Sequence, residues 1–203
     1  MSSPAHAASP WPAPDAGRMN PRAYRLHVLQ IGLWMFLGTA TMLFGAFTSA
    51  MLVRRSGGDW LPTILPSILW LNTACLIGSS VALEAGRAMA ARARWAAARL
   101  GVGAAIALGL VFLAGQLEAW RDLVAAGVYL PTNPHSAFFF ILTGVHAVHL
   151  IAGLLLLTVT FNQTRPDTGR TTVTPQGVLT LGATFWHFFA VVWIYLFYVL
   201  SVL

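Results

Sequence analysis

The sequence contains no lysine, only six acidic residues and a single cysteine among its 203 residues. Charged residues make up 9% of the chain, which is too few for the surface of a soluble protein and excludes a soluble fold. The one cysteine, Cys75, lies in an apolar segment. The chain can therefore form neither an intrachain disulfide nor a thiolate metal cluster, and we interpret Cys75 as a small buried residue.

Apolar residues account for 57% of the chain, and the mean hydropathy is +0.70. They are grouped into five long stretches, and about 20 apolar residues suffice for a helix to cross a bilayer. The sequence therefore predicts an all-α polytopic membrane protein, a bundle of five transmembrane helices in one domain over residues 23–203. The predicted spans cover about residues 27–53, 61–85, 98–120, 136–161 and 176–202.

Residues 1–22 form a Pro/Ala-rich segment without the apolar core of a secretory signal. Such a composition cannot bury enough apolar surface to fold. We expect a disordered cytoplasmic tail that is not cleaved.

The arginines are unevenly divided between the two sides of the predicted bundle. With the N-terminus inside, the inner side carries nine, namely Arg18, Arg22, Arg25, Arg87, Arg92, Arg94, Arg99, Arg165 and Arg170. The outer side carries three, namely Arg54, Arg55 and Arg121. The positive-inside rule then predicts a cytoplasmic N-terminus and a periplasmic or extracellular C-terminus. Because the basic residues are not gathered into one patch on a soluble module, we expect no nucleic-acid partner.

The alanine-rich segment 85–99 is predicted to be a helix that protrudes at the inner face. Its Arg87, Arg92 and Arg94 are candidate ligands for anionic lipid headgroups, because a guanidinium group matches a phosphate bidentately. Plain positive-inside anchoring is the alternative. Glu84 lies one turn before Arg87, and we interpret these two as an interfacial ion pair, in preference to a proton carrier.

Three histidines, His146, His149 and His187, fall within predicted spans. Imidazole is a common metal and haem ligand, and a haem between helices would need His187 facing His146 or His149. Their predicted depths match, at about 15 Å for His146 and about 16 Å for His187, so depth leaves a haem site open.

The alternative interpretation treats these histidines as interior hydrogen-bonding groups. Their partners would be other buried polar groups or a backbone carbonyl. The candidate side chains are Thr143, Gln116, Glu84 and Asn72. We favour this interpretation because no second ligand pair, haem-attachment motif or carboxylate trio accompanies the histidines.

Two longer motifs and two shorter ones carry a family resemblance. Residues 136–149 contain an S-x-F-F run followed by T-G-x-H-x-x-H, and residues 185–193 follow the form Y-W-H-F-x-D-x-x-W with two differences. The shorter motifs are Asn72-Thr73 with Ser79-Ser80, and Gly115-Gln116 with Trp120. Together they resemble subunit III of haem-copper cytochrome c oxidases in its five-helix bacterial form.

This resemblance implies an accessory, non-catalytic subunit of an oxidase that reduces O₂ to water and pumps protons across the bacterial inner membrane. The haem and copper would belong to partner subunits, above all catalytic subunit I, and this chain would bind none. It would support assembly, phospholipid binding and sustained proton uptake. The residues carried over as packing or hydrogen-bonding positions are His146, His149, Trp186 and His187.

Two positions depart from the family pattern: Ala40 replaces a glutamate in the first span, and Ala190 replaces the aspartate after the Trp-His-Phe motif. Both losses favour a scaffold over an ionisable role within the bundle. A quinol oxidase subunit III and a nitric oxide reductase-associated subunit are alternatives, because other chains handle the electron donor and acceptor. An independent di-histidine haem b protein or a small transporter is a more distant alternative.

Overall fold

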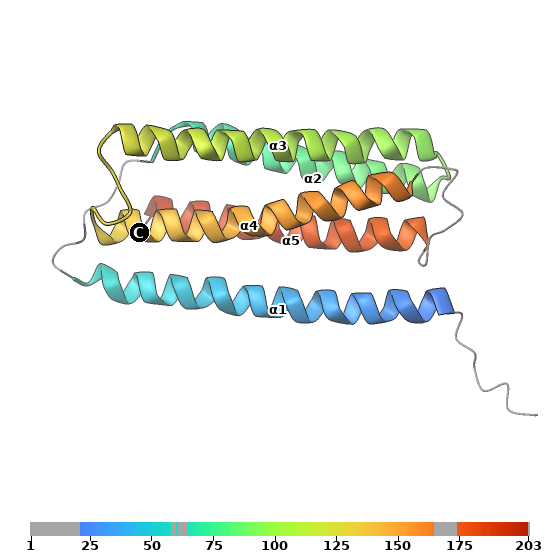
Figure 1. The fold of residues 1–203 in the computed structure, drawn as a ribbon, viewed down its shortest axis with the longest axis horizontal. Coiled ribbons are helices and arrows are strands. Elements are labelled where there is room, and N and C mark those ends of the chain that lie inside the picture. Colours follow the sequence, from blue (N-terminus) through green and yellow to red (C-terminus); the bar gives the residue numbers. More distant parts are fainter. Residues whose placement is uncertain (1–20, 58–59, 61–64, 165–173, 203) are drawn as a thin grey trace, which may run out of the picture.

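The computed structural model describes residues 21–57, 60, 65–164 and 174–202, so the predicted tail, apart from its last two residues, lies outside the described part. It forms five helices and no strand within those ranges (Figure 1). They are α1 (Pro21–Arg55), α2 (Ile68–Ala91), α3 (Trp95–Ala125), α4 (Pro134–Gln163) and α5 (Pro175–Val202). Each is long and apolar enough to cross a membrane. The predicted fold class, an all-α bundle of five transmembrane helices, is confirmed.

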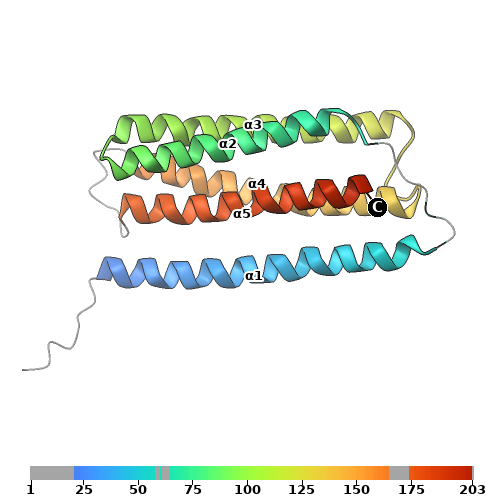
Figure 2. The ribbon, with the colours of Figure 1, turned by 180° about the vertical axis from the view of Figure 1, so that it is seen from behind.

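The helices are arranged in three layers, which both views show (Figures 1 and 2). Helices α2 and α3 form one layer, α4 and α5 the middle layer, and α1 lies against the other side of the middle layer. In the described residues α1 contacts only α4 and α5. Helices α2 to α5 therefore form a four-helix bundle to which α1 is added from one side.

Small residues bring α2 and α3 unusually close together. A Cβ atom on Gly101 would lie 2.7 Å from the Cα atom of Gly86, and the hydroxyl of Ser79 donates to the carbonyl of Ala105 at 2.9 Å. Gly109, one turn further along α3, instead accommodates the ring of Trp186 from α5. The small residues Gly101 and Ala105 thus face α2, while Gly109 leaves room for side chains of α4 and α5.

The main difference from the predicted elements is at the ends of α2. This helix begins at Ile68, just after Pro66, and not near residue 61; it ends at Ala91. The segment 85–99, predicted as one protruding helix, is divided by a turn at residues 92–94. Ala93 has a left-handed backbone there (φ 57°), and the amide of Arg94 donates back to the carbonyl of Met89. This turn reverses the chain so that α3 can pack along α2.

Helix α4 begins where the sequence supplies a complete cap. The side chain of Asn133 accepts a hydrogen bond from the amide of Ser136, while the Ser136 hydroxyl accepts one from the amide of Asn133. Pro134 occupies the first turn, where a missing amide proton costs nothing. This cap fixes the start of the helix that carries His146 and His149.

Candidate functional site

His146 lies fully buried in the centre of the bundle and is surrounded by aromatic rings. Its ring centroid is 5.3 Å from that of Trp193, and 6.2 Å from those of Phe112 and Phe189. Phe44 of α1 completes the surroundings at 6.3 Å. Neither ring nitrogen has a hydrogen-bond partner among the described residues. The ring of His146, on α4, therefore contacts rings from α1, α3 and α5.

His149, one turn further along α4, lies at the junction with α1. Its Nδ1 donates to the carbonyl of Val145 at 2.7 Å. The ring stacks on Phe189 at 4.7 Å and faces Phe36 and Phe44 of α1 at 5.8 and 5.7 Å. These aromatic contacts form much of the packing that holds α1 on the middle layer.

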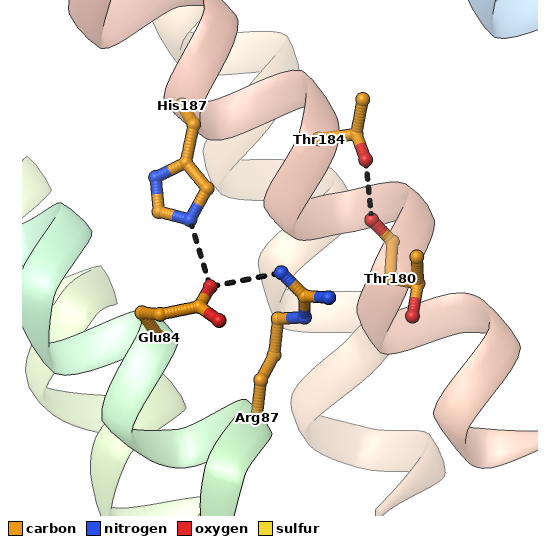
Figure 3. A network of polar contacts seen from close by, with 5 residues as sticks. All are labelled: Glu84, Arg87, Thr180, Thr184 and His187. Carbon is orange, nitrogen blue, oxygen red and sulfur yellow. Dashed lines mark hydrogen bonds and ion pairs between the residues drawn. The ribbon is translucent and has the colours of Figure 1, made fainter.

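His187 belongs to a separate polar cluster between α5 and α2 (Figure 3). Its Nε2 lies 3.3 Å from the Glu84 carboxylate, and the Arg87 guanidinium donates to the same oxygen at 2.8 Å. The expected pair of Glu84 and Arg87 is thus present, and His187 adds a link to a second helix. All three side chains are partly exposed, at 56% for Glu84, 34% for Arg87 and 32% for His187.

The three histidines do not surround one common space. On α5, His187 is about 160° around the helix from Phe189, the residue that contacts both His146 and His149. A haem held between His187 and either of the other two would require both rings to face the same gap. The described residues also contain no group of three or more histidine, cysteine or acidic side chains placed to hold a metal ion. His187 therefore lies on a different side of α5 from Phe189, which His146 and His149 contact.

Three tryptophans connect different layers of the bundle. Trp193 donates from its indole nitrogen to the Thr73 hydroxyl of α2 at 3.0 Å, and Trp120 donates to the Thr143 hydroxyl of α4 at 3.1 Å. Trp186 is fully buried, and it lies against the backbone of Gly109 on α3 and of Gly153 on α4. Each ring bridges two or more helices.

The two tryptophan–threonine bonds were not identified from the sequence. Each threonine also donates to a carbonyl of its own helix, Thr73 to Leu69 and Thr143 to Phe139, so its oxygen is left to accept from indole. A threonine whose hydroxyl proton is bonded within its own helix can still accept a hydrogen bond from another helix. The sequence does not show which residue donates that bond, so the acceptor can be identified only once the facing helix is known.

Asn72 and Gln116 are buried polar side chains with unpartnered atoms. The amide nitrogen of Asn72 and both polar atoms of Gln116 have no partner in the described structure. Asn72 occupies space that exists only because residue 115 is glycine, since a Cβ atom there would overlap its amide oxygen. Gln116 lies one turn from Trp120 and one turn from Phe112, which contact α4 at Thr143 and His146. It thus lies on α3 between residues that contact α4 at His146 and at Thr143.

Ala40 and Ala190, which stand where the resemblance expects acids, are both buried, with exposures of 3% and 5%. Ala40 lies one turn from Phe36 and from Phe44, the residues of α1 that face His149. Apolar contacts thus fill the surroundings in which a carboxylate would have to be accommodated.

The three arginines predicted to bind lipid headgroups are not equivalent. Arg87 is directed toward Glu84 and α5, whereas Arg92 and Arg94 lie exposed in the turn between α2 and α3. Only these two remain directed away from the bundle.

Comparison with known proteins adds an independent line of information. A sequence model of the family described as "Cytochrome c oxidase subunit III" matches residues 23–202. The cytochrome c oxidase subunit 3 of a Synechocystis strain is 33% identical, with 82% of this chain and 72% of the relative aligned. That of Thermostichus vulcanus is 31% identical, with 85% and 86% aligned. A protein of Staphylococcus saprophyticus named as a probable quinol oxidase subunit 3 is 27% identical, with 90% and 92% aligned.

Proposed function

This chain belongs to the cytochrome c oxidase subunit III family, and from that membership we propose that it is the non-catalytic scaffold subunit of its oxidase complex. The resemblance inferred from the sequence motifs is confirmed. The chain is a multi-pass membrane protein and a subunit III of a haem-copper respiratory oxidase.

One observation supports the proposal: the rings of the three histidines within the spans face side chains of neighbouring helices and do not converge on one shared site. His146 and His149 pack among phenylalanines and tryptophan, and His187 pairs with Glu84 of α2. Hydrogen bonds between helices stabilise membrane bundles by about 1 kcal/mol each. The subunit therefore uses its polar groups to keep one fixed arrangement of helices.

Membership of this family places the chain among other oxidase subunits, and we propose that its direct partner is the catalytic subunit I. That subunit would hold the haem and copper, and this chain would bind neither. With alanine at positions 40 and 190, the bundle has no buried carboxylate in the described residues to relay protons. Its contribution to proton uptake would be indirect, through support of subunit I during assembly and turnover.

The electron donor of the complex has two candidates. Two relatives are cytochrome c oxidase subunits, which favours cytochrome c, while the Staphylococcus saprophyticus relative favours a quinol oxidase. The bound lipid is the other part of the proposal: Arg92 and Arg94, with Arg87 more distant, would hold anionic headgroups at the cytoplasmic surface.

Affinity purification of the tagged chain from native membranes in mild detergent tests the scaffold role. We expect a haem-bearing polypeptide to be recovered with it, and a strain without this chain to yield an oxidase that assembles poorly or loses activity during turnover. Recovery of the chain without any haem-bearing partner would contradict the proposal.

A further inference from the structure

The carboxylate of Glu84 lies at membrane depth on the surface of the bundle. It contacts His187, which follows the first residue of α5, Pro175, by 12 residues and is thus about 18 Å from the cytoplasmic end of that helix by the predicted orientation. A hydrocarbon core of about 30 Å centred on α5 would begin about 6 Å from the same end. The carboxylate is therefore roughly 10 Å inside the core. Even so, 56% of the Glu84 side chain is exposed.

One oxygen of this carboxylate makes both of its contacts. Oε2 lies 2.8 Å from the Arg87 guanidinium and 3.3 Å from the ring of His187, whereas Oε1 has no partner in the described part of the chain (Figure 3). Hydrocarbon offers no hydrogen bonds, so charged side chains within a bilayer face protein or a water-filled cavity. Oε1 is thus left to accept a hydrogen bond from outside this chain.

A cavity of about 230 Å³ lies beside Glu84, between α2 and α5. Arg87 and Ala88 of α2 line it on one side, and Gln176 and Thr180 of α5 line it on the other. The cavity is too small for a helix but large enough for one long side chain. Its lining includes the Glu84 carboxylate, while the charge of Arg87 is already directed at Glu84. A neutral side chain that carries an N–H group therefore suits it best.

The surface around this cavity is a single face of the bundle formed by α2 and α5, and it is mainly apolar (Figure 2). Helix α2 contacts only α3 and α5 among the described helices, so no described helix covers this face. Exposed residues recur along α2 at intervals of three or four, which places them in one stripe. They are Ala74, Ile77, Val81, Glu84 and Ala88. The stripe has the length and the small residues on which another transmembrane helix packs closely.

We propose that this face of α2 and α5 binds a transmembrane helix of the haem-bearing subunit, and that one neutral N–H side chain of that helix enters the cavity and donates to Glu84. A partner helix supplies both apolar contact along Ile77 and Val81 and a donor at this depth. A lipid headgroup lies at the boundary of the core and does not reach it. The inference rests on the proposed association with a catalytic subunit and adds where that subunit binds.

Photo-crosslinking in native membranes tests which face binds the partner. The photoreactive residue p-benzoylphenylalanine replaces Val81, one turn before Glu84, or Ala107 on α3 as the control. Ala107 is exposed and nearly level with Val81, because Gly101 of α3 lies beside Gly86 of α2. We expect a crosslink to the haem-bearing subunit from residue 81 and none from residue 107. Crosslinks from residue 81 only to lipid, or only to a second copy of this chain, would overturn the proposal.

Two substitutions test the contact itself through the amount of haem-bearing subunit that is recovered with the tagged chain. Glu84→Leu removes the acceptor, and we expect about fivefold less recovery, the factor that corresponds to about 1 kcal/mol for one interhelical hydrogen bond. Ala88→Trp fills the cavity without removing a described side-chain bond, and it should reduce recovery at least as much. The matched controls on α3 are Ala107→Trp and Glu118→Leu, which removes the similar exposed pair with Arg121. Both should leave recovery unchanged.

The outcomes separate this inference from the proposed function. Unchanged recovery with both Glu84→Leu and Ala88→Trp would overturn the inference, since that result is expected if only water fills the cavity. A crosslink from residue 107 and none from residue 81 would also overturn it, but the haem-bearing partner would then still be present and the proposed function would stand. Failure of the unchanged chain to recover any haem-bearing polypeptide would contradict the proposed function and this inference with it.

Discussion

Buried polar atoms without partners are the most unusual feature at the scale of single residues. An amide group removed from water without a hydrogen bond costs about 1–3 kcal/mol in protein mutational data. Gln116 carries two such atoms, and His146 carries two more. Neither residue forms a described bond that its replacement would break. Around His146, the helices are therefore held together by the packing of aromatic side chains.

Replacement of Gln116 by leucine is accordingly expected to leave the free energy of unfolding unchanged, or to raise it by about 1–2 kcal/mol, because an unsatisfied amide is removed. Denaturant unfolding in detergent micelles measures the change. A loss of stability of similar size would show that the amide is bonded in the folded protein.

The bond from Trp193 to Thr73 is expected to behave in the opposite way. Trp193→Phe and Thr73→Val each remove one partner of an interhelical hydrogen bond, and a double-mutant cycle should give a coupling free energy of about 0.5–1.5 kcal/mol. The same unfolding assay applies. Additive effects of the two substitutions would mean that the bond contributes nothing to stability.

At the scale of helices, the close approach of α2 and α3 depends on glycine. A Cβ atom on Gly101 would lie 2.7 Å from both the carbonyl oxygen of Ala82 and the Cα atom of Gly86. Backbone atoms cannot move aside as a flexible side chain can. The two helices would have to separate, and the layer that they form would lose contacts along its length.

Gly101→Ala is therefore expected to destabilise the bundle by about 1–3 kcal/mol, the usual cost of overpacking. Gly103→Ala is the matched control on the same helix, since its Cβ atom would make only an ordinary contact with Phe161, and it should leave stability unchanged. Thermal unfolding of the two variants side by side measures the difference. Similar melting temperatures would show that α2 and α3 can separate at little cost.

The number and approximate position of the helices could be predicted because membrane spans require long apolar runs, and five such runs are present. The start of α2 was predicted too early, because a proline is compatible with the first turn of a helix and also with the loop before it. The turn at Ala93 could not be predicted. Alanine gives no signal for a left-handed backbone, and packing of α3 on α2 decides where the chain reverses.

The candidate site could be predicted only in part. The composition identifies His146, His149 and His187 as polar groups in spans, but not which helices they face. The helices that these histidines face depend on how α4 and α5 are rotated about their axes. The sequence does not specify this rotation, because the side chains around each helix are similarly hydrophobic. The link from Trp193 to Thr73 joins residues 120 positions apart, and no local pattern marks it. The residue patterns and the family resemblance both favoured a structural role for these residues, but neither showed their neighbours.

At the scale of the whole molecule, the arginine distribution predicts how the bundle lies in the membrane. With Cys75 replaced by alanine, a cysteine can be introduced for Ala91, at the α2–α3 turn, or for Ala126, at the α3–α4 turn; both residues are exposed. A membrane-impermeant maleimide added to intact spheroplasts is expected to label the Ala126→Cys variant alone. Labelling of the Ala91→Cys variant alone would reverse the proposed orientation.

The most direct test of the scaffold role is the metal and haem content of the purified chain, since a subunit that only supports its partner has no redox centre of its own. The oxidase complex is purified, this chain is separated from it in mild detergent, and both fractions are examined by absorption spectroscopy and by iron and copper analysis. We predict that all haem and copper remain with the partner subunits and that the separated chain shows no Soret band. Stoichiometric haem, iron or copper in the separated chain would contradict the account.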